Sequence, residues 1–349
     1  MPRRILIFKT NASAPVNRKR TSLKTIRAFL IGAGLCLVLA GCRQGPPGRT
    51  IHLAHGLDVT HSVHLAMVRM GEDLERLSGG RLRMEIFPNQ QLGSEREILE
   101  LLQIGTLDMT KVSAATLENF APKTRILGLP YLFRDREAAF EILDGPIGQE
   151  LLDDGLEFWL KGLGFYDAGF RSFYAMDQPI THPDDLVGKK VRVMESVTAI
   201  NMIRSMGGAP TPISWGELYT ALQQGVVDAA ENNPPSFYLA RHYEVCKYYS
   251  LDEHTFSPDV LIAGTRFWDQ LNEQEKAWIR EAADNSIAYQ RELWALAEAE
   301  ALEKVAAAGV EISRPDKRPF AEGSREAYRL YEADTTLGRL IRQIKEFQQ

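Results

Sequence analysis

The chain has 349 residues, with 41 Lys or Arg against 46 Asp or Glu and a formal net charge of −5 at neutral pH. The first 41 residues hold eight of the basic residues and none of the acidic ones, so the rest has 33 basic against 46 acidic residues, near −13. Such an acidic protein is a poor candidate for nucleic-acid binding, which requires a basic surface. An anionic ligand would have to be held by local positive groups, because the field of the whole protein repels it.

The N-terminal 41 residues have the layout of a secretory signal peptide, with a basic stretch followed by an apolar run, AFLIGAGLCLVLAGC. This run is short for a membrane span. It ends in Leu-Ala-Gly-Cys at residues 39–42, which resembles a bacterial lipobox. We therefore predict a signal peptide over 1–41, a linker over 42–49, and a periplasmic, membrane-anchored lipoprotein whose lipid is carried by Cys42. Ordinary signal cleavage near an incidental cysteine is the alternative.

From residue 50 onward, strand patterns alternate with helix patterns. Apolar periodicity predicts strands near 50–57, 82–88 and 107–113 and helices near 62–80 and 94–106. The second helix begins with Ser94 as its N-cap and Glu97 three residues later, which is a capping box. This β-α-β-α-β order predicts an α/β domain with a largely parallel sheet.

A second α/β unit begins near residue 165. Strand-like GFYDAGFRSFYA is followed by the strand GKKVRVME, by a helix that ends at Gly207-Gly208, and by a helix and strand within SWGELYTALQQGVVDAAENN. Residues 272–308 are rich in strong helix formers and predict a long helix that spans both domains. We expect domain I over 50–168 and 258–297, domain II over 169–257 and 298–349, and ordered strand crossings that act as a hinge.

Arg192 lies in the middle of an otherwise apolar strand, between Val191 and Val193. A buried arginine is rare unless it is paired, and an unpaired charge inside a protein costs several kcal/mol. Its partner is either an internal acid, such as Glu195, or an anion that does not belong to the chain. The residues by themselves favour neither reading.

Six segments, taken in order, resemble DctP-type solute-binding proteins of TRAP (tripartite ATP-independent periplasmic) transporters, over about residues 50–345. They are QLGSEREILELLQIGTLDM, GLPYLF, GKKVRV, GGAPTPISWGELYTALQQGVVDAAENNPPSF, HYEVCKYYSLDEHTFSPDVLIAG and FWDQL. The resemblance implies a periplasmic binding protein-like fold. It also implies that Arg192 forms a two-pronged salt bridge with a ligand carboxylate, for which the planar guanidinium is suited.

The same resemblance implies further ligand contacts in the second domain. Arg171 matches a second arginine of the family, with a surface or hinge salt bridge as its alternative. Asn232 matches a family amide and offers both a donor and an acceptor. Asn233 could share this role or could instead cap the following turn. Trp215 is expected either to stack on a sugar ring or to fill the core.

Candidate ligand contacts in the first domain are predicted mainly from the places of the residues in its helices and strands. Glu95 could accept sugar hydroxyls or could simply be a first-turn acid on the helix dipole. Lys111 and Ser113 end a strand at the edge where α/β sheets usually bind ligands. His61 could contact the ligand. The spacing His61-x-x-His64 would also suit a metal, but no third ligand has suitable spacing.

We therefore expect an extracytoplasmic binding protein that captures a sugar acid by hinge closure and delivers it to TRAP membrane permease subunits. Glucuronate or galacturonate comes first, with aldonates, diketogulonate and C4-dicarboxylates as alternatives. We expect no cofactor, no metal and no enzymatic activity, and the chain has no P-loop motif for ATP. The competing classes are an extracytoplasmic enzyme acting on uronates and a sensory or structural lipoprotein.

Overall fold

The computed structural model describes residues 48–349. Residues 1–47 lie outside the described residues, and with them the predicted signal peptide and the predicted lipid anchor at Cys42. Within 48–349, none of the helices is both long and apolar enough to span a membrane. Residues Gly48–Gln349 form one compact unit.

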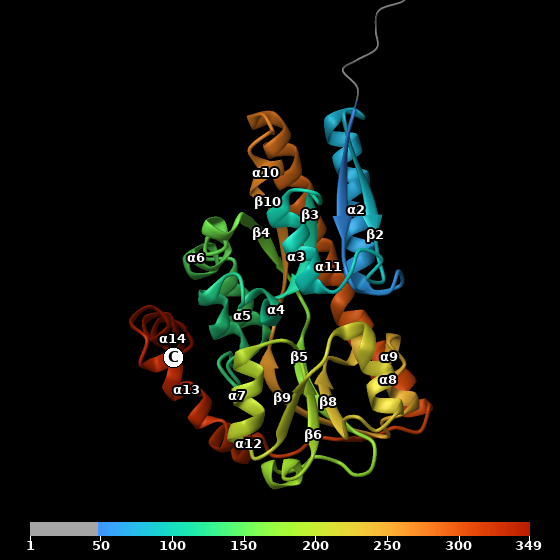
Figure 1. Cartoon of the computed structure of the whole chain (residues 1–349), viewed down its shortest axis with the longest axis vertical. Coiled ribbons are helices and arrows are strands. Elements are labelled where there is room, and N and C mark those ends of the chain that lie inside the picture. Colours follow the sequence, from blue (N-terminus) through green and yellow to red (C-terminus); the bar gives the residue numbers. More distant parts are fainter. Residues whose placement is uncertain (1–47) are drawn as a thin grey trace, which may run out of the picture. The chain divides into compact units, whose positions relative to one another are not determined.

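The first sheet, with the helices packed on it, forms what we call the first lobe (Figure 1). Its strand order is β2-β1-β3-β10-β4. The strands are β1 (Arg49–Ala54), β2 (Leu82–Phe87), β3 (Met109–Ser113), β4 (Leu160–Tyr166) and β10 (Asp259–Gly264). The helices in this part of the chain are α2 (Ser62–Ser78), α3 (Glu95–Ile104), α4 (Ala114–Leu117), α5 (Arg136–Leu143), α6 (Pro146–Asp153), α10 (Thr265–Trp268) and the 3-10 helices η1 (Pro122–Gly128) and η2 (Leu156–Phe158).

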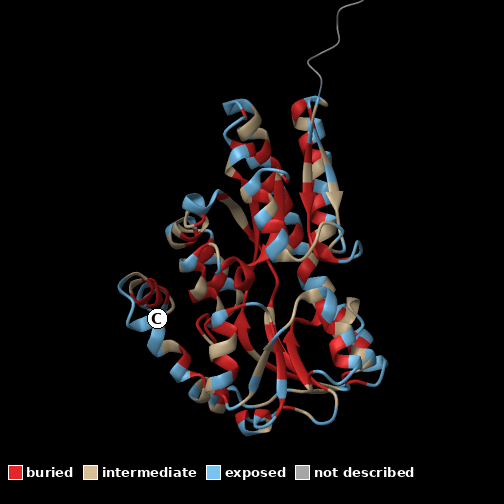
Figure 2. Ribbon diagram, viewed as in Figure 1, coloured by how far each residue is buried: buried red, intermediate tan, exposed pale blue. Residues whose placement is uncertain are grey.

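The second sheet belongs to the second lobe and has the order β11-β9-β5-β8-β6-β7. Its strands are β5 (Phe170–Ala175), β6 (Lys190–Val193), β7 (Ala209–Pro212), β8 (Ala229–Asn232), β9 (Tyr248–Phe256) and β11 (Glu311–Ser313). Its helices are α7 (Val197–Ser205), α8 (Leu218–Gln223), α9 (Pro234–Leu239), α12 (Lys317–Gly323), α13 (Arg325–Glu332) and the 3-10 helices η3 (Pro183–Leu186), η4 (Trp215–Glu217) and η5 (His242–Glu244). In both sheets the central strands are the most deeply buried elements (Figure 2).

The predicted α/β class with two sheets is confirmed, but the sheets are mixed rather than largely parallel. In the first lobe β1 is parallel to β2 and β3, whereas β10 runs antiparallel to both β3 and β4. In the second lobe β5 is antiparallel to β8 and β9. The reversal follows from the chain path, because β9 leads directly into β10 and crosses back into the first sheet.

Helix α11 (Glu273–Ala307) is continuous over 35 residues and begins with a capping box between Asn272 and Glu275. Its N-terminal half places Ile279 and Ile287 in a core cluster of the first lobe. Its C-terminal end places Val305 in a core cluster of the second lobe. The helix therefore packs on both lobes, as its length and composition predict.

The crossing from β4 to β5 is tied to α11. Gln290 accepts a hydrogen bond from the Asp167 backbone N–H at 2.7 Å and donates one to the Asp167 carbonyl at 2.7 Å. Gly169 follows with φ of 60°, and a Cβ there would lie 3.0 Å from Trp294 Nε1. Two strand crossings and one long helix thus connect the lobes, which is an arrangement suited to hinge bending.

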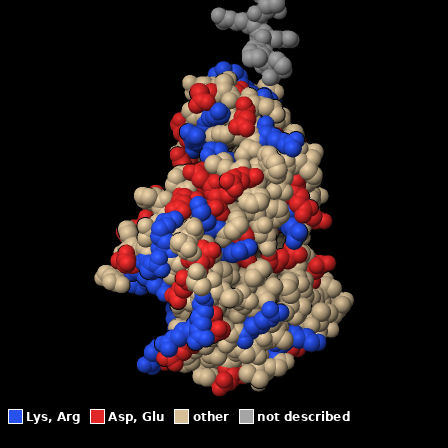
Figure 3. Space-filling view, turned by 60° about the vertical axis from the view of Figure 1, so that its left-hand side comes forward, with Lys and Arg blue, Asp and Glu red and all other residues tan. Residues whose placement is uncertain are grey.

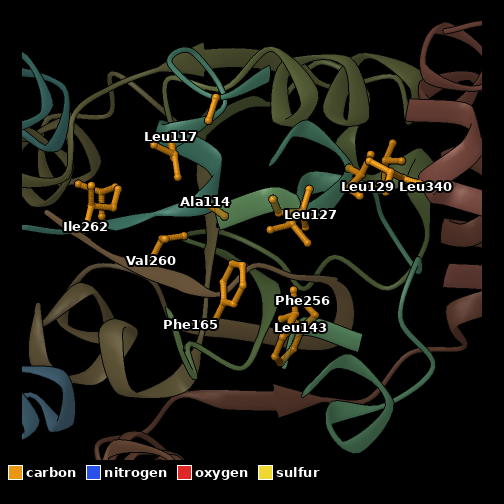
Figure 4. Packing of buried hydrophobic residues seen from close by; sticks show 14 of the residues in the cluster. Ala114, Leu117, Leu127, Leu129, Leu143, Phe165, Phe256, Val260, Ile262 and Leu340 are labelled. Atoms are coloured by element: carbon orange, nitrogen blue, oxygen red, sulfur yellow. The ribbon is translucent and has the colours of Figure 1, made fainter. Parts of the chain in front are cut away.

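The last helix, α14 (Thr335–Phe347), packs on the first lobe, although the sequence assigned 298–349 to the second domain. Leu340 and Ile344 are fully buried in the cluster that contains Leu127 and Leu129. Leu340 lies beside Leu129 in Figure 4. The amphipathic pattern of α14 places its apolar face in this core. The pattern does not specify which of the two lobes the helix covers.

Candidate functional site

A cavity lined by residues of both sheets and their loops lies between the two lobes. Every residue predicted for ligand binding lines it, namely His61, Glu95, Lys111, Ser113, Arg171, Arg192, Trp215, Asn232 and Asn233. Residues as far apart in the sequence as His61 and Asn233 therefore meet at one site. The lining side chains differ in their hydrogen bonds and ion pairs. Some have polar atoms available to a ligand, and others are already paired with groups of the protein.

Arg192 is almost fully buried, with 2% of its surface exposed, on strand β6, which lies between β8 and the edge strand β7. Its Nε donates to the carbonyl oxygen of Ile213 at 2.9 Å, while Nη1 is buried and has no hydrogen-bond partner within residues 48–349. Among these residues no acid lies within ion-pair distance of it, and Glu195 is exposed. Burial lowers the pKa of the Arg192 guanidinium, which shows that its charge is poorly compensated.

Arg171, in contrast, is already paired. Its Nε and Nη2 both donate to the carboxylate of Glu231, Nη2 also reaches the Glu231 carbonyl at 2.8 Å, and Nη1 donates to Asn232 Oδ1 at 2.9 Å. In the antiparallel pairing of β5 and β8, Phe173 lies opposite Glu231. This register brings the side chains of Arg171 and Glu231 together. This is the internal salt bridge that we named as the alternative for Arg171, so its guanidinium reaches the cavity wall with its charge neutralised.

His254 extends this ion pair into a buried charge network. Its Nδ1 lies 2.8 Å from Asp252 Oδ2, and its Nε2 lies 3.6 Å from Glu231 Oε2. Burial opposes protonation, but the two carboxylates raise the pKa of His254 to about 9. Burial likewise opposes ionisation of Glu231, but the charges of Arg171 and His254 lower its pKa to about 2. The network is therefore charged and internally balanced at neutral pH.

Asn232 and Asn233 have different roles, a point that the sequence left open. Asn233 caps α9, since its Oδ1 accepts from the Ser236 backbone N–H at 2.8 Å. Asn232 Oδ1 accepts from Arg171 and from the Asn233 backbone N–H at 2.9 Å. Among residues 48–349 the amide nitrogen of Asn232 has no such bond, and it is the group that Asn232 can offer to a ligand.

The first lobe contributes a second buried cluster. Lys111 Nζ lies 2.8 Å from Asp259 Oδ2 and 3.3 Å from Glu95 Oε1. Glu95 also accepts from the Ser113 backbone N–H at 3.1 Å and from Thr116 Oγ1 at 2.8 Å. The Glu95 carboxylate is therefore held in one orientation at the cavity wall, where it can accept hydrogen bonds but cannot swing away.

Two nitrogen donors of the first lobe also face the cavity. His61 caps α2 by accepting from the Val63 backbone N–H at 3.2 Å, and its buried Nε2 has no partner within residues 48–349. Burial lowers the pKa of His61 to about 3, so the ring is neutral. Gln90 also lines the cavity, and its buried Nε2 has no hydrogen-bond partner in the described part of the chain. Sequence reasoning missed it because a glutamine in a turn carries no distinctive pattern.

Trp215, in η4, lies at the rim of the cavity and packs edge-on against His242, with ring centroids 5.1 Å apart. It therefore both fills the second-lobe core and lines the cavity. His64 bonds to His55 at 2.9 Å rather than pointing toward His61. Within residues 48–349, no group of three or more His, Cys, Asp or Glu side chains is arranged to hold a metal ion.

Residues 53–334 match the family model of the bacterial extracellular solute-binding proteins, family 7 (DctP). The chain is similar to a TRAP periplasmic solute-binding protein from Xanthobacter autotrophicus Py2, solved with bound β-D-galacturonate (39% identity, TM-score 0.83, covering 85% of this chain and 99% of that one). It is similar to one from Anaerococcus prevotii, solved with bound D-glucuronate (34% identity, TM-score 0.83, 85% and 97%). It is 27% identical over 301 residues to the 2,3-diketo-L-gulonate-binding periplasmic protein YiaO of Escherichia coli, covering 86% of this chain and 91% of YiaO.

Proposed function

The chain belongs to the bacterial extracellular solute-binding proteins of family 7 (DctP), and on that premise we propose that it captures a hexuronate between its lobes for a TRAP transporter. D-galacturonate and D-glucuronate are the first candidates, because structures 39% and 34% identical to this chain hold these two sugars. Diketogulonate, aldonates and C4-dicarboxylates are the alternatives, to be compared with these two sugars in one assay.

The observation that carries the proposal is the unpaired guanidinium of Arg192. Its Nε is engaged by Ile213, so Nη1 and Nη2 are the nitrogens that can grip a carboxylate end-on. A bidentate, charge-assisted pair of this kind is both strong and geometrically selective. The ligand carboxylate supplies the counter-charge that the described part of the chain does not.

The remaining walls suit the polyhydroxylated part of a sugar acid. Glu95 can accept a hydrogen bond from a sugar hydroxyl, and Asn232 Nδ2 can donate one to a hydroxyl oxygen. Trp215 adds an aromatic ring to the cavity wall. Because Arg192 and Asn232 belong to the second lobe and Glu95 to the first, a bound ligand touches both lobes and favours the closed arrangement.

Capture by this chain is binding without turnover, and the membrane subunits of the transporter are its partners. The family is described as extracellular, and we place the protein in the periplasm, anchored through lipid on Cys42. On the face shown in Figure 3, Lys and Arg are interspersed with Asp and Glu. This surface is consistent with a soluble domain that meets a protein partner rather than nucleic acid.

Thermal-shift screening of the mature protein against sugar acids and dicarboxylates tests the ligand assignment. At a hundredfold excess over Kd, a ligand stabilises the folded state by about 2.7 kcal/mol, which is readily seen as a raised melting temperature. We expect hexuronates to give the largest shift. No shift with any sugar acid, together with a shift from a dicarboxylate, would reverse the assignment.

Two further experiments test the parts of the proposal that concern activity and anchoring. A bound hexuronate, incubated with the protein and then released, should be recovered chemically unchanged, and turnover would favour an enzyme. For the anchor, Cys42→Ser expressed in the native host should move the protein from the membrane fraction to the soluble periplasmic fraction. Equal fractionation of both forms would argue for ordinary signal cleavage.

A further inference from the structure

Within residues 48–349, the buried polar atoms of the cavity wall that lack a hydrogen-bond partner are three nitrogens. They are His61 Nε2, Gln90 Nε2 and Arg192 Nη1. No buried side-chain oxygen of the wall lacks a partner among the same residues, and Glu95, Asn232 and Asn233 are examples of oxygens that accept hydrogen bonds. The cavity wall therefore has an excess of donors for which residues 48–349 provide no acceptor.

The tautomer of His61 follows from its role as a helix cap. Its Nδ1 accepts a hydrogen bond from the Val63 backbone N–H, so Nδ1 carries a lone pair and the proton of the neutral ring lies on Nε2. His61 is 3% exposed, so water has little access to this N–H. The cap at the N-terminus of α2 therefore makes His61 Nε2 a hydrogen-bond donor and sets the direction of its N–H.

Gln90 reaches across the cavity mouth from the first lobe to the second. It follows Asn89 in a turn where both residues have positive φ, 54° and 58°, which sets the direction of the side chain. A Cβ built on Gly216, in η4 of the second lobe, would lie 2.1 Å from Gln90 Oε1. This close approach places the Gln90 amide at a point that exists only when the lobes have come together.

We propose that His61 Nε2 and Gln90 Nε2 donate hydrogen bonds to the ligand and also disfavour closure of the empty protein, an inference that rests on the proposed function. Closing the lobes without a ligand strips water from both N–H groups and leaves them unpaired, which is unfavourable. A ligand that brings oxygen acceptors, such as sugar hydroxyls or a ring oxygen, removes this penalty. The ligand class is therefore an acid that carries oxygen acceptors on its far side as well as a carboxylate for Arg192.

The test uses variants that remove one donor at a time. His61→Asn retains a favoured N-cap residue but has no donor at the position of Nε2. Gln90→Met keeps the length of the side chain without the amide. The matched control is Gln91→Met, since Gln91 is exposed and does not line the cavity.

Two measurements are made on each variant in the mature protein. Titration calorimetry with the hexuronate that binds the wild type should give a Kd about five- to tenfold higher for His61→Asn and Gln90→Met, as expected for one lost hydrogen bond. Pulsed electron–electron spin resonance between labels at the exposed positions Glu100 and Arg204 should show a larger closed fraction in the ligand-free variants than in the wild type or Gln91→Met.

Weaker binding combined with easier empty closure is the signature that a merely structural role would not produce. The proposal is overturned if both variants bind within twofold of the wild type, or if their ligand-free closed fraction does not rise. Should the wild type bind no sugar acid, the proposed function fails, while the ligand-free closure measurement still decides whether these donors oppose closing.

Discussion

Substitution of Arg192 by Met is the most direct test of the site. Met preserves much of the aliphatic volume of the side chain but removes every donor and the charge. In the ligand-free protein, Arg192 makes one bond, to the Ile213 carbonyl, and has no acidic partner among residues 48–349. We therefore expect the melting temperature of the empty protein to change by no more than about 2–3 °C, because one backbone hydrogen bond is worth roughly 1 kcal/mol.

Binding should respond far more strongly than stability. Nη1 and Nη2 can provide two charge-assisted hydrogen bonds to the ligand carboxylate, each worth about 1.5–3 kcal/mol. Losing both raises Kd by about 10²- to 10⁴-fold, since each 1.4 kcal/mol is a factor of ten. At a ligand concentration of a hundred times the wild-type Kd, the thermal stabilisation of about 2.7 kcal/mol falls to about 0.4 kcal/mol or less.

The assay is titration calorimetry together with thermal unfolding, with and without the hexuronate. The wild type should shift by about 5 °C, and Arg192→Met by about 1 °C or less. Arg204→Met is the control, because Arg204 is exposed on α7 in the same lobe and does not line the cavity. A Kd of Arg192→Met within threefold of the wild type would refute the reasoning, since a carboxylate held elsewhere would not depend on this guanidinium.

Three further expectations concern the charge network and the packing. Arg171→Met should lower the free energy of unfolding in urea by about 3–5 kcal/mol, because it leaves the buried carboxylate of Glu231 unpaired, and Arg171→Met combined with Glu231→Met should recover much of this loss. Because the folded-state pKa of His254 is raised to about 9, its contribution is complete below about pH 6.5 and is lost as pH rises toward 9, so the wild type should lose stability over this range and His254→Gln should lose less. Gly148→Ala should reduce stability by more than about 1 kcal/mol without changing Kd, because its Cβ would lie 1.7 Å from the Leu143 carbonyl oxygen and Gly148 does not line the cavity; an unchanged unfolding midpoint would contradict this packing.

Local structure was readable from the sequence wherever short-range chemistry decides it. The capping box of Ser94 and Glu97 and the composition of 272–308 predicted α3 and α11, which the structure contains with nearly these bounds. The apolar residues around Arg192 likewise predicted the strand β6, and the burial of a charge within this strand indicated a ligand site. Such features depend on neighbours within a few residues along the chain.

Only the tertiary structure separated Arg192 from Arg171. Both are strand arginines in the sequence, but the register of β5 and β8 supplies Arg171 with Glu231, whereas β6 lies where no described acid reaches Arg192. The same holds for Gln90, whose role depends on the approach of Gly216 from the other lobe. Periodicity and capping act within one element, but the pairing of a buried charge is decided by which distant strands become neighbours, and one sequence read alone does not contain those distances.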